Sequence, residues 1–353
     1  MVKRISTISD RYGATMRDVA ETAGVSQATV SYVLSGKEGA RVGATTRMRV
    51  LDAAARLRYT PNAIARAMAL GKSGIVGVYQ PHTGVSPLAG MWTAAVMRGV
   101  GAGLHQESYH LLLYGYLEDK PPAGAAFLDG SVDGLIIIAS HEADSLPLQL
   151  AEAGFPTAII GGAALSGGTI VTADANNVAG GRMAAAHLIE LGHSCIVHLA
   201  GPREVPNAED RRKGFEIEIA ERGAMNLADC VVEAGFDELG GYRGARAALD
   251  RFPRATGLFA ANDIAALGAI DACRDLGYRI PQDISIIGYD DAPICQITQP
   301  ALTSIRQPAE EMGCAAARRL LQMIRGESAA GHYVFEPTLS VRSSTSAPTE
   351  RRT

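Results

Sequence analysis

The sequence has few of the features that mark secreted or membrane proteins. It contains five cysteines (Cys195, Cys230, Cys273, Cys295 and Cys314), none in a Cys-x-x-Cys pair, so neither a disulfide framework nor a zinc site is expected. No apolar run approaches the ~18 residues of a membrane span. The polar stretch 1–13 lacks the apolar segment of a secretion signal. These absences predict a cytoplasmic protein with no membrane partner.

Motifs for catalysis and for cofactors are also missing. The glycines at 99, 101 and 103 follow a helical pattern rather than a strand, so they are not expected to form a dinucleotide-binding loop. The eight histidines show no metal-ligand spacing, and no Gly-x-Ser-x-Gly motif occurs. Asp290 and Asp291 are neighbours at a predicted strand end, where adjacent side chains point apart. We therefore expect no enzymatic activity, no bound metal and no cofactor.

Charge is unevenly distributed along the 353 residues, a length that favours two or more domains. Residues 1–73 carry 12 Lys and Arg against 5 Asp and Glu, whereas the remainder has a net charge of −11. A basic head on an acidic body suits a head that meets the phosphates of a nucleic acid. A solvated basic surface without such a partner would give the same balance, so charge alone leaves both interpretations open.

The residues from Thr15 onward predict two short helices joined by a tight turn. Thr15 is a plausible N-cap for a helix over 16–23, and Gly24 follows where a turn requires positive φ. Ser26 caps a second helix that extends to about residue 34. Small and β-branched side chains then pack the helices together (Val19, Ala20, Ala23, Val25, Val30 and Val33). This pattern is typical of a helix-turn-helix.

With those residues inward, the second helix presents a polar face that includes Gln27, Ala28, Ser31, Tyr32 and Ser35. Residues at the start of such a helix reach base edges in the major groove of DNA. Gln27 can form two hydrogen bonds with adenine, and Ala28 can contact a thymine methyl group. The alternative is an ordinary exposed helix face.

A third helix is predicted over 45–57, and four arginines along it are candidate phosphate contacts (Arg47, Arg49, Arg56 and Arg58). The stretch Tyr-Thr-Pro-Asn at 59–62 precedes a short helical segment, 63–70. The residues 71–74, Gly-Lys-Ser-Gly, are typical of a linker.

The residues 16–36, MRDVAETAGVSQATVSYVLSG, and 45–69, TTRMRVLDAAARLRYTPNAIARAMA, resemble the DNA-binding head of the lactose-repressor (LacI/GalR) family. The resemblance implies a hinge helix after residue 62 that inserts an apolar side chain, usually leucine, into the minor groove. Met68 takes that position here, and Tyr32 replaces the arginine or histidine of many members. The expected DNA contacts are Thr15, Ser26, Gln27, Ala28, Thr29, Ser31, Tyr32, Asn62, Ala65 and Met68.

From residue 74 the chain alternates short apolar runs with helical segments. The runs include 75–80, 110–115, 134–140, 157–160, 170–173, 195–200, 230–234, 257–261 and 284–288. Such runs are typical of parallel strands covered on both faces. About ten strands exceed one compact sheet, so the predicted fold class is α/β, with two doubly wound parallel lobes behind an all-α head.

The segments 174–194, 259–292 and 299–308 resemble the second lobe of the same family, whose body is shared with periplasmic sugar-binding proteins. The resemblance implies a head at 1–60, a hinge and linker at 61–73, an effector-binding and dimerisation domain at 74–347 and a polar tail at 348–353. Lobe 1 would span about 74–174 and 305–335, and lobe 2 about 175–304 and 336–347. It also places Arg211, Phe236, Asn262 and Asp290 against a small-molecule effector.

The first lobe departs from this pattern, because Gly161 stands where several sugar-binding relatives have aspartate. Gln80, His82 and Trp92 are weaker candidates for the effector site. The overall expectation is a homodimeric transcriptional regulator, acting as a repressor, that binds a pseudo-palindromic operator and responds to a sugar or sugar derivative. The rival interpretations are a cytoplasmic small-molecule-binding module without DNA binding, and an enzyme whose active site is the cleft between the two lobes.

Overall fold

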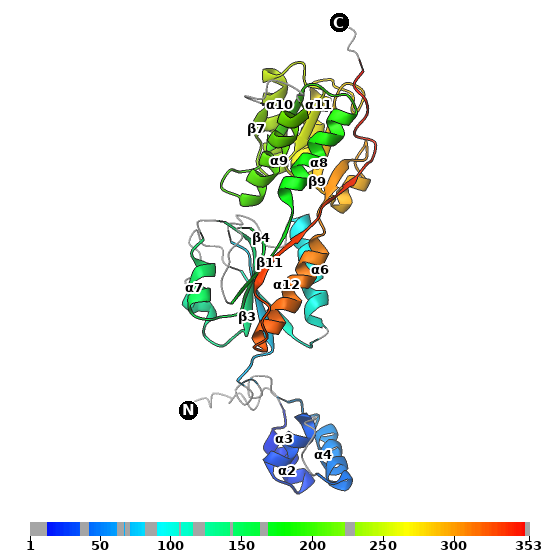
Figure 1. The fold of residues 1–353 in the computed structure, drawn as a ribbon. Helices are drawn as coiled ribbons and strands as arrows, with labels where there is room; N and C mark the ends of the chain where they lie inside the picture. The colour runs from blue at the N-terminus through cyan, green and yellow to red at the C-terminus, as the bar shows by residue number, and fades with distance from the viewer. Residues whose placement is uncertain are drawn as a thin grey trace, which may run out of the picture. The chain divides into compact units, whose positions relative to one another are not determined.

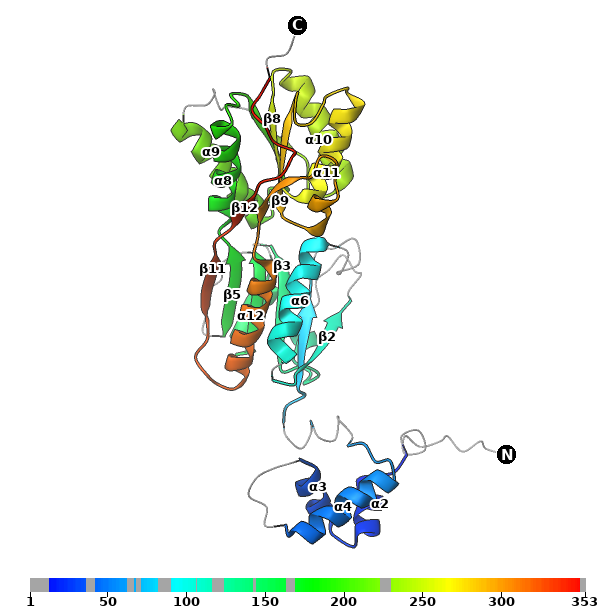
Figure 2. The same ribbon diagram turned by 90° about the vertical axis from the view of Figure 1, so that its right-hand side faces the viewer.

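The computed structural model describes residues 13–35, 42–61, 67, 71–81, 90–105, 107–115, 124–141, 144–162, 169–222 and 230–349. The chain divides into two compact units, Met1–Ser73 and Gly74–Thr353 (Figures 1 and 2). Within the described ranges, no helix has both the length and the apolar character needed to cross a membrane.

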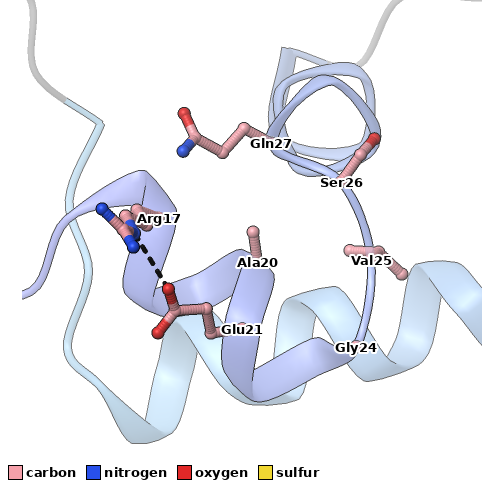
Figure 3. Close-up of a pocket in the computed structure, with 7 residues that line it drawn as sticks. All are labelled: Arg17, Ala20, Glu21, Gly24, Val25, Ser26 and Gln27. Atoms are coloured by element: carbon pink, nitrogen blue, oxygen red, sulfur yellow. Dashed lines mark hydrogen bonds and ion pairs between the residues drawn. The ribbon is translucent and has the colours of Figure 1, made fainter.

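The first unit, the head, contains helices α2 (Met16–Ala23), α3 (Gln27–Ser35) and α4 (Ala44–Arg56). Thr15 closes a full capping box with Asp18, and Gly24 ends α2 in the left-handed conformation that the turn requires. The Ser26 hydroxyl accepts a hydrogen bond from the Thr29 backbone N–H at 3.2 Å. These local signals set the path from α2 into α3 that Figure 3 shows.

The head is held together by a small apolar core to which all three helices contribute. Val19, Val30 and Val50 are fully buried, and Ala20 and Ala23 fill the space beside them. The predicted helix-turn-helix is confirmed, and the first helix has the predicted bounds.

The second unit, the body, has two six-stranded sheets, each with helices on both faces. The first sheet has the order β11-β5-β4-β3-β1-β2 and is parallel throughout. Its strands are β1 (Ile75–Tyr79), β2 (His110–Tyr114), β3 (Gly134–Ser140), β4 (Thr157–Gly162), β5 (Ile170–Ala175) and β11 (Gly331–Phe335). Its helices are α6 (Met91–His105), α7 (Leu146–Glu152) and α12 (Ala309–Ile324), with the 3₁₀ turn η1 (Gly124–Phe127).

The second sheet has the order β12-β10-β9-β8-β6-β7. Its strands are β6 (Ile196–Ala200), β7 (Val231–Glu233), β8 (Gly257–Ala260), β9 (Ser285–Asp290), β10 (Thr303–Arg306) and β12 (Thr338–Ser340). Its helices are α8 (Asn177–Glu190), α9 (Pro206–Arg222), α10 (Glu238–Arg251) and α11 (Asp263–Asp275), with the 3₁₀ turn η2 (Pro293–Gln296). The predicted two doubly wound lobes are confirmed, although β12 pairs antiparallel with β10.

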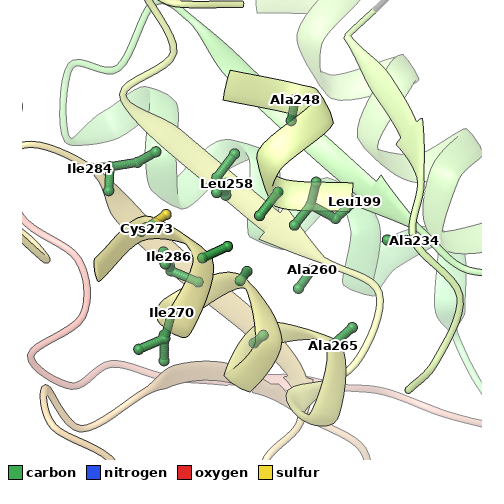
Figure 4. Close-up of a cluster of buried hydrophobic side chains, with 14 of the residues drawn as sticks. Leu199, Ala234, Ala248, Leu258, Ala260, Ala265, Ile270, Cys273, Ile284 and Ile286 are labelled. Carbon is green, nitrogen blue, oxygen red and sulfur yellow. The ribbon is translucent and has the colours of Figure 1, made fainter. Parts of the chain in front are cut away.

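Alternate residues of each central strand enter separate cores, because successive side chains point to opposite faces of a sheet. In β8, Leu258 and Ala260 join the cluster under α10 and α11, whereas Phe259 packs toward α8 and α9. Figure 4 shows the first of these clusters, in which Ile286 of the neighbouring strand β9 and Ile284 just before it lie beside Cys273. All five cysteines are free thiols, as predicted.

Pairs of glycines let the helices on one face approach closely. A Cβ atom on Gly99 of α6 would lie 2.0 Å from the Glu310 carbonyl oxygen of α12, and one on Gly313 would lie 2.3 Å from that of Val96. The same reciprocal arrangement joins Gly181 to α9 and Gly268 to α10. Figures 1 and 2 show α6 and α12 side by side. The glycines predicted not to form a dinucleotide loop therefore belong to helix α6.

The chain passes between the two sheets three times, after β5, after β10 and after β11. Two of these passages are bonded to each other, since the Asn176 backbone N–H donates to the Phe335 carbonyl at 2.8 Å. The Asn176 amide also donates to Glu336 at 3.1 Å. The third passage follows Arg306, and its first residue, Gln307, enters the candidate site described below.

Candidate DNA-binding and effector sites

The polar face predicted for the second helix is present on α3. Ser26, Gln27, Ala28, Ser31 and Tyr32 are exposed, whereas Val30 and Val33 are buried behind them. Thr29 is half-buried, and its hydroxyl lies 3.0 Å from that of Ser26. The structure therefore gives this face the rigid backing that a base-reading helix requires.

A shallow hollow separates α2 from the start of α3, and Figure 3 shows the Gln27 amide above it. Arg17 of α2 lies on the same side and forms a 2.9 Å ion pair with Glu21. The sequence interpretation did not include Arg17, although its exposure next to Gln27 makes it a candidate DNA contact. The predicted positions Asn62, Ala65 and Met68 lie outside the described residues.

The effector residues predicted in lobe 2 lie at one end of the second sheet. Arg211 of α9 is buried; its Nε donates to Asn177 at 2.9 Å and its Nη1 to the Ala261 carbonyl at 2.6 Å. Its guanidinium carbon is 3.8 Å from the centre of the Tyr289 ring. Protein acceptors therefore take two of the five N–H donors of this guanidinium.

Asn262 and Phe236 are adjacent in the same region. The Asn262 side-chain oxygen accepts from the Ala265 backbone N–H at 2.8 Å and caps α11, while its nitrogen donates to the Phe236 carbonyl at 2.9 Å. The half-buried Phe236 ring packs on Gly201, where a Cβ atom would lie 2.7 Å from it. Both groups of the Asn262 amide are thus bonded to the protein itself. Its capping of α11 accounts for the position of this side chain.

Asp290 ends β9 with its carboxylate bonded to the Gln307 amide at 2.5 Å. Both Asp290 and Asp291 have positive φ, at 114° and 58°, a conformation that costs a non-glycine residue about 1–3 kcal/mol. Burial raises the pKa of Asp290 to about 6, while the nearby Arg211 charge acts to lower it. This strained aspartate is therefore held by its surroundings rather than by local preference.

The first lobe contributes Trp92 and Gly161. Gly161, the last residue but one of β4, has a φ of 64°, and a Cβ atom there would lie 2.7 Å from the Trp92 ring and 3.4 Å from the amide of Asn207. Trp92 therefore covers the position where an aspartate would otherwise project. Asn207 belongs to α9 of the other lobe, so these three residues meet where the lobes meet.

Asn207 continues a chain of contacts into the second lobe. Its nitrogen donates to Asp174 at 3.1 Å, and Asn177 donates to the same Asp174 oxygen at 3.3 Å. Asn177 in turn accepts from Arg211 and from the Tyr289 hydroxyl, the latter at 3.2 Å. Burial raises the pKa of Asp174 to about 6, and backbone N–H groups of Ala175 and Gly162 oppose the shift. Thus Trp92, Arg211 and the residues between them form one connected site.

Several buried polar atoms of this site have no hydrogen-bond partner among the described residues: Gln80 Oε1, Trp92 Nε1, Asn207 Oδ1 and Gln307 Oε1. The Gln80 side-chain nitrogen donates to the Thr93 hydroxyl at 3.4 Å. Native proteins rarely leave buried polar groups without a partner, and each one costs about 1–3 kcal/mol. Where the two lobes meet, these atoms therefore offer hydrogen-bonding capacity that a bound ligand or water can use.

A cleft of about 720 Å³ has Trp92, Asp290 and Gln307 in its wall, whereas Gln80 and Asn207 do not line it. Most of its lining comes from α6 and α12, including the Arg98–Glu310 ion pair at 2.7 Å. The predicted residue His82 lies outside the described residues.

The sequence interpretation missed Asp174, Asn177, Asn207 and Gln307. Asn207 lies early in a long helix with no motif around it, and Gln307 follows a strand that was not predicted. Asp174 and Asn177 lie in the segment whose resemblance to the family was recognised, but they were not assigned a role. Their proximity to Arg211 and Asp290 arises from tertiary packing, which no local pattern reports.

Comparisons with known proteins cover almost the whole chain. Residues 15–62 match the family model described as bacterial regulatory proteins, lacI family, and residues 185–345 match a periplasmic binding protein-like domain. The HTH-type transcriptional regulator CelR of Thermobifida fusca is 33% identical over 94% of this chain and 98% of its own length.

Solved structures show the same similarity. A complex of the transcriptional regulator CelR with cellobiose is 30% identical, with a TM-score of 0.72 over 94% of this chain and 99% of that one. The Lac repressor dimer bound to operator and the anti-inducer ONPF is 28% identical, with a TM-score of 0.82 over 95% of this chain and 100% of that one. The similarity therefore includes head, body and their order.

Proposed function

Because the chain belongs to the LacI family of bacterial regulatory proteins, it is a DNA-binding transcriptional regulator controlled by a small molecule, and we propose that this effector is a neutral sugar held between the two lobes. Family membership favours the regulator over an enzyme and over a binding module that lacks DNA binding.

The observation that carries the proposal is the set of buried polar atoms at the junction of the lobes that have no partner in the described part of the chain. Three of the four are amide oxygens, which only accept, and the Asp290 carboxylate adds further acceptors. Such a site suits a ligand rich in hydroxyl donors. A phosphate or carboxylate would instead favour cationic partners, whereas the side chains that carry these atoms are neutral amides and an indole.

Trp92 supplies an aromatic face and one hydrogen-bond donor. Its ring lies against Gly161, and its buried N–H is a single donor without a partner among the described residues. An aromatic face packs well against the apolar C–H face of a sugar ring, while the N–H can donate to a hydroxyl oxygen. The similar CelR structure contains cellobiose, which has this neutral, many-hydroxyl chemistry.

For the DNA interaction, we propose a cytoplasmic homodimer whose two heads bind the halves of a pseudo-palindromic operator, with Gln27, Ala28 and Tyr32 of α3 at the bases. The Lac repressor that this chain resembles is a dimer on its operator. Met68 of the proposed hinge enters the minor groove. Sugar binding changes how the lobes hold the two hinges, and by linkage the operator must change sugar affinity equally.

The effector proposal is tested by thermal shift and calorimetry with cellobiose, D-ribose, their phosphate esters and purine bases. We expect a neutral sugar to raise the melting temperature of the wild-type protein. Gln307→Met should abolish that increase because it removes an amide from the cleft wall, whereas Gln322→Met on α12 should retain it. A larger shift with a phosphate ester or a purine would overturn the neutral-sugar assignment, as would the absence of any shift.

A further inference from the structure

The end of strand β9 is held in an unusual backbone conformation. Asp290 and Asp291 are consecutive non-glycine residues with positive φ, and only five such residues occur in the part of the chain that the structure describes. This conformation is uncommon for side chains other than asparagine and aspartate, and it persists where surrounding contacts impose it. The contacts that impose it here can be identified individually.

Asp263, the first residue of α11, holds one side of the backbone at residues 290–292. Its carboxylate accepts from the Ala292 backbone N–H at 2.7 Å and from the Ser304 hydroxyl at 2.6 Å. The Ser304 oxygen in turn accepts from the Asp291 backbone N–H at 3.1 Å. Asp263 is almost fully buried and Ser304 is fully buried. Two successive backbone N–H groups after Asp290 are thus fixed, one directly by Asp263 and one through Ser304.

Gly288 makes room for this arrangement, since a Cβ atom there would lie 2.3 Å from the Asp263 carboxylate. On the other side, the Asp291 carboxylate forms a 2.6 Å ion pair with Arg342 and accepts from Ser340 at 2.7 Å. Arg342 also donates to the Leu302 carbonyl at 2.7 Å. Residues 290–292 are therefore held by contacts from α11, from β10 and from Ser340 and Arg342 at the end of β12.

We propose that Asp263 and Ser304 are positioning residues for effector recognition. Neither side chain contacts the effector: they fix the backbone so that the Asp290 carboxylate meets the Gln307 amide and faces the cleft. This inference rests on the proposed function, because it assigns Asp290 to the effector. Its structural part, the backbone conformation of residues 290–291, does not depend on any ligand.

The test compares Ser304→Ala with Ser285→Ala. Both serines are fully buried in neighbouring strands of the same sheet, and both hydroxyls donate a hydrogen bond. Ser285, however, donates to the Ser346 carbonyl at 3.1 Å, away from residues 290–292. Crystal structures of both variants without ligand provide the first readout. Ser304→Ala should move residues 290–291 out of positive φ and break the Asp290–Gln307 contact, whereas Ser285→Ala should preserve both.

Calorimetry with cellobiose, and with D-ribose if cellobiose does not bind, provides the second readout. Ser304→Ala should weaken sugar binding about tenfold, as expected for a hydrogen bond to a charged group, and leave sugar-free operator binding unchanged. Ser285→Ala should lower the melting temperature without changing sugar affinity. In an Asp290→Asn background, Ser304→Ala should have no further effect on sugar affinity, because both act through the same carboxylate.

The outcomes separate this inference from the proposed function. If neither sugar binds the wild-type protein, the neutral-sugar proposal fails, while the crystal structures still decide the positioning role. If Ser304→Ala leaves residues 290–291 in place, or weakens sugar binding no more than Ser285→Ala does, the positioning role is refuted.

Discussion

Two glycines on helix α6 allow the packing of the first lobe to be tested with a single methyl group. Gly99 faces α12, where an added Cβ atom would lie 2.0 Å from the Glu310 carbonyl oxygen and 2.9 Å from its Cα. Gly101 is on the same helix two residues later, with no atom within 4 Å of an added Cβ. Gly99→Ala and Gly101→Ala therefore change the same helix by the same group and differ only in what that group meets.

The magnitudes follow from opposing effects. Alanine in place of glycine favours a helix interior by about 1 kcal/mol, and Gly101→Ala should gain much of this. At Gly99 the helices must move apart by more than 1 Å to reach ordinary contact distances above 3.4 Å. Overpacking of this kind costs about 1–3 kcal/mol, and the obstacle here is backbone that cannot rotate away. We expect a net loss of about 1–2 kcal/mol for Gly99→Ala.

Differential scanning calorimetry and urea unfolding of the two variants measure the difference directly. The melting temperature should fall for Gly99→Ala and rise slightly for Gly101→Ala, at roughly 2–4 °C for each kcal/mol in a domain of this size. Equal stability of the two variants would refute the conclusion that the α6–α12 pair depends on direct backbone contact.

Three further predictions concern the cleft and the head. Sugar affinity should fall as the pH drops from about 8 to 5, because burial raises the pKa of Asp290 to about 6 and that of the neighbouring Asp263 to about 7, and protonation of this pair removes its negative charge from beside the cleft. Calorimetry at pH 5 and 8 measures this, and a flat profile would contradict it. Gly161→Ala should weaken sugar binding by displacing Trp92. Gly154→Ala, with a similar φ of 68° but no atom within 4 Å of its Cβ, should lower the free energy of unfolding without changing sugar affinity. Equal sugar affinities of the two variants would argue against a role for Trp92 in sugar binding. Thr15→Ala should destabilise the head by about 1 kcal/mol through loss of the capping box, which faster hydrogen exchange in α2 would show. Thr22→Ala, at an exposed position of the same helix, is the control, and equal exchange rates in the two variants would exclude a stabilising role for the Thr15 cap.

The sequence was most informative where local chemistry determines structure. Thr15, Gly24 and Ser26 mark the ends of the first two helices with side-chain caps and a left-handed turn, and those helices appear where they were predicted. The apolar runs likewise predicted most strands, because strands buried on both faces have few polar residues.

The unpredicted strands have the opposite character. Strands β10, β11 and β12 are short and contain polar residues; β11 and β12 are edge strands, and β10 lies next to β12. They exist because neighbouring strands pair with them. The candidate site shows the same limit: Arg211 and Asp290 were predicted from family resemblance, whereas Asn207 and Gln307 were found only from their positions in the folded chain.

The central claim is that the exposed face of α3 reads the operator. Its most direct test is a binding competition between an operator selected from random duplexes and a scrambled duplex, for the wild-type protein and a Gln27→Ala, Tyr32→Ala double variant. Each good base contact contributes about 1–3 kcal/mol of discrimination, so the preference for the operator should fall at least tenfold while binding to the scrambled duplex is unchanged. An unaltered preference would contradict the assignment of α3 as the reading helix.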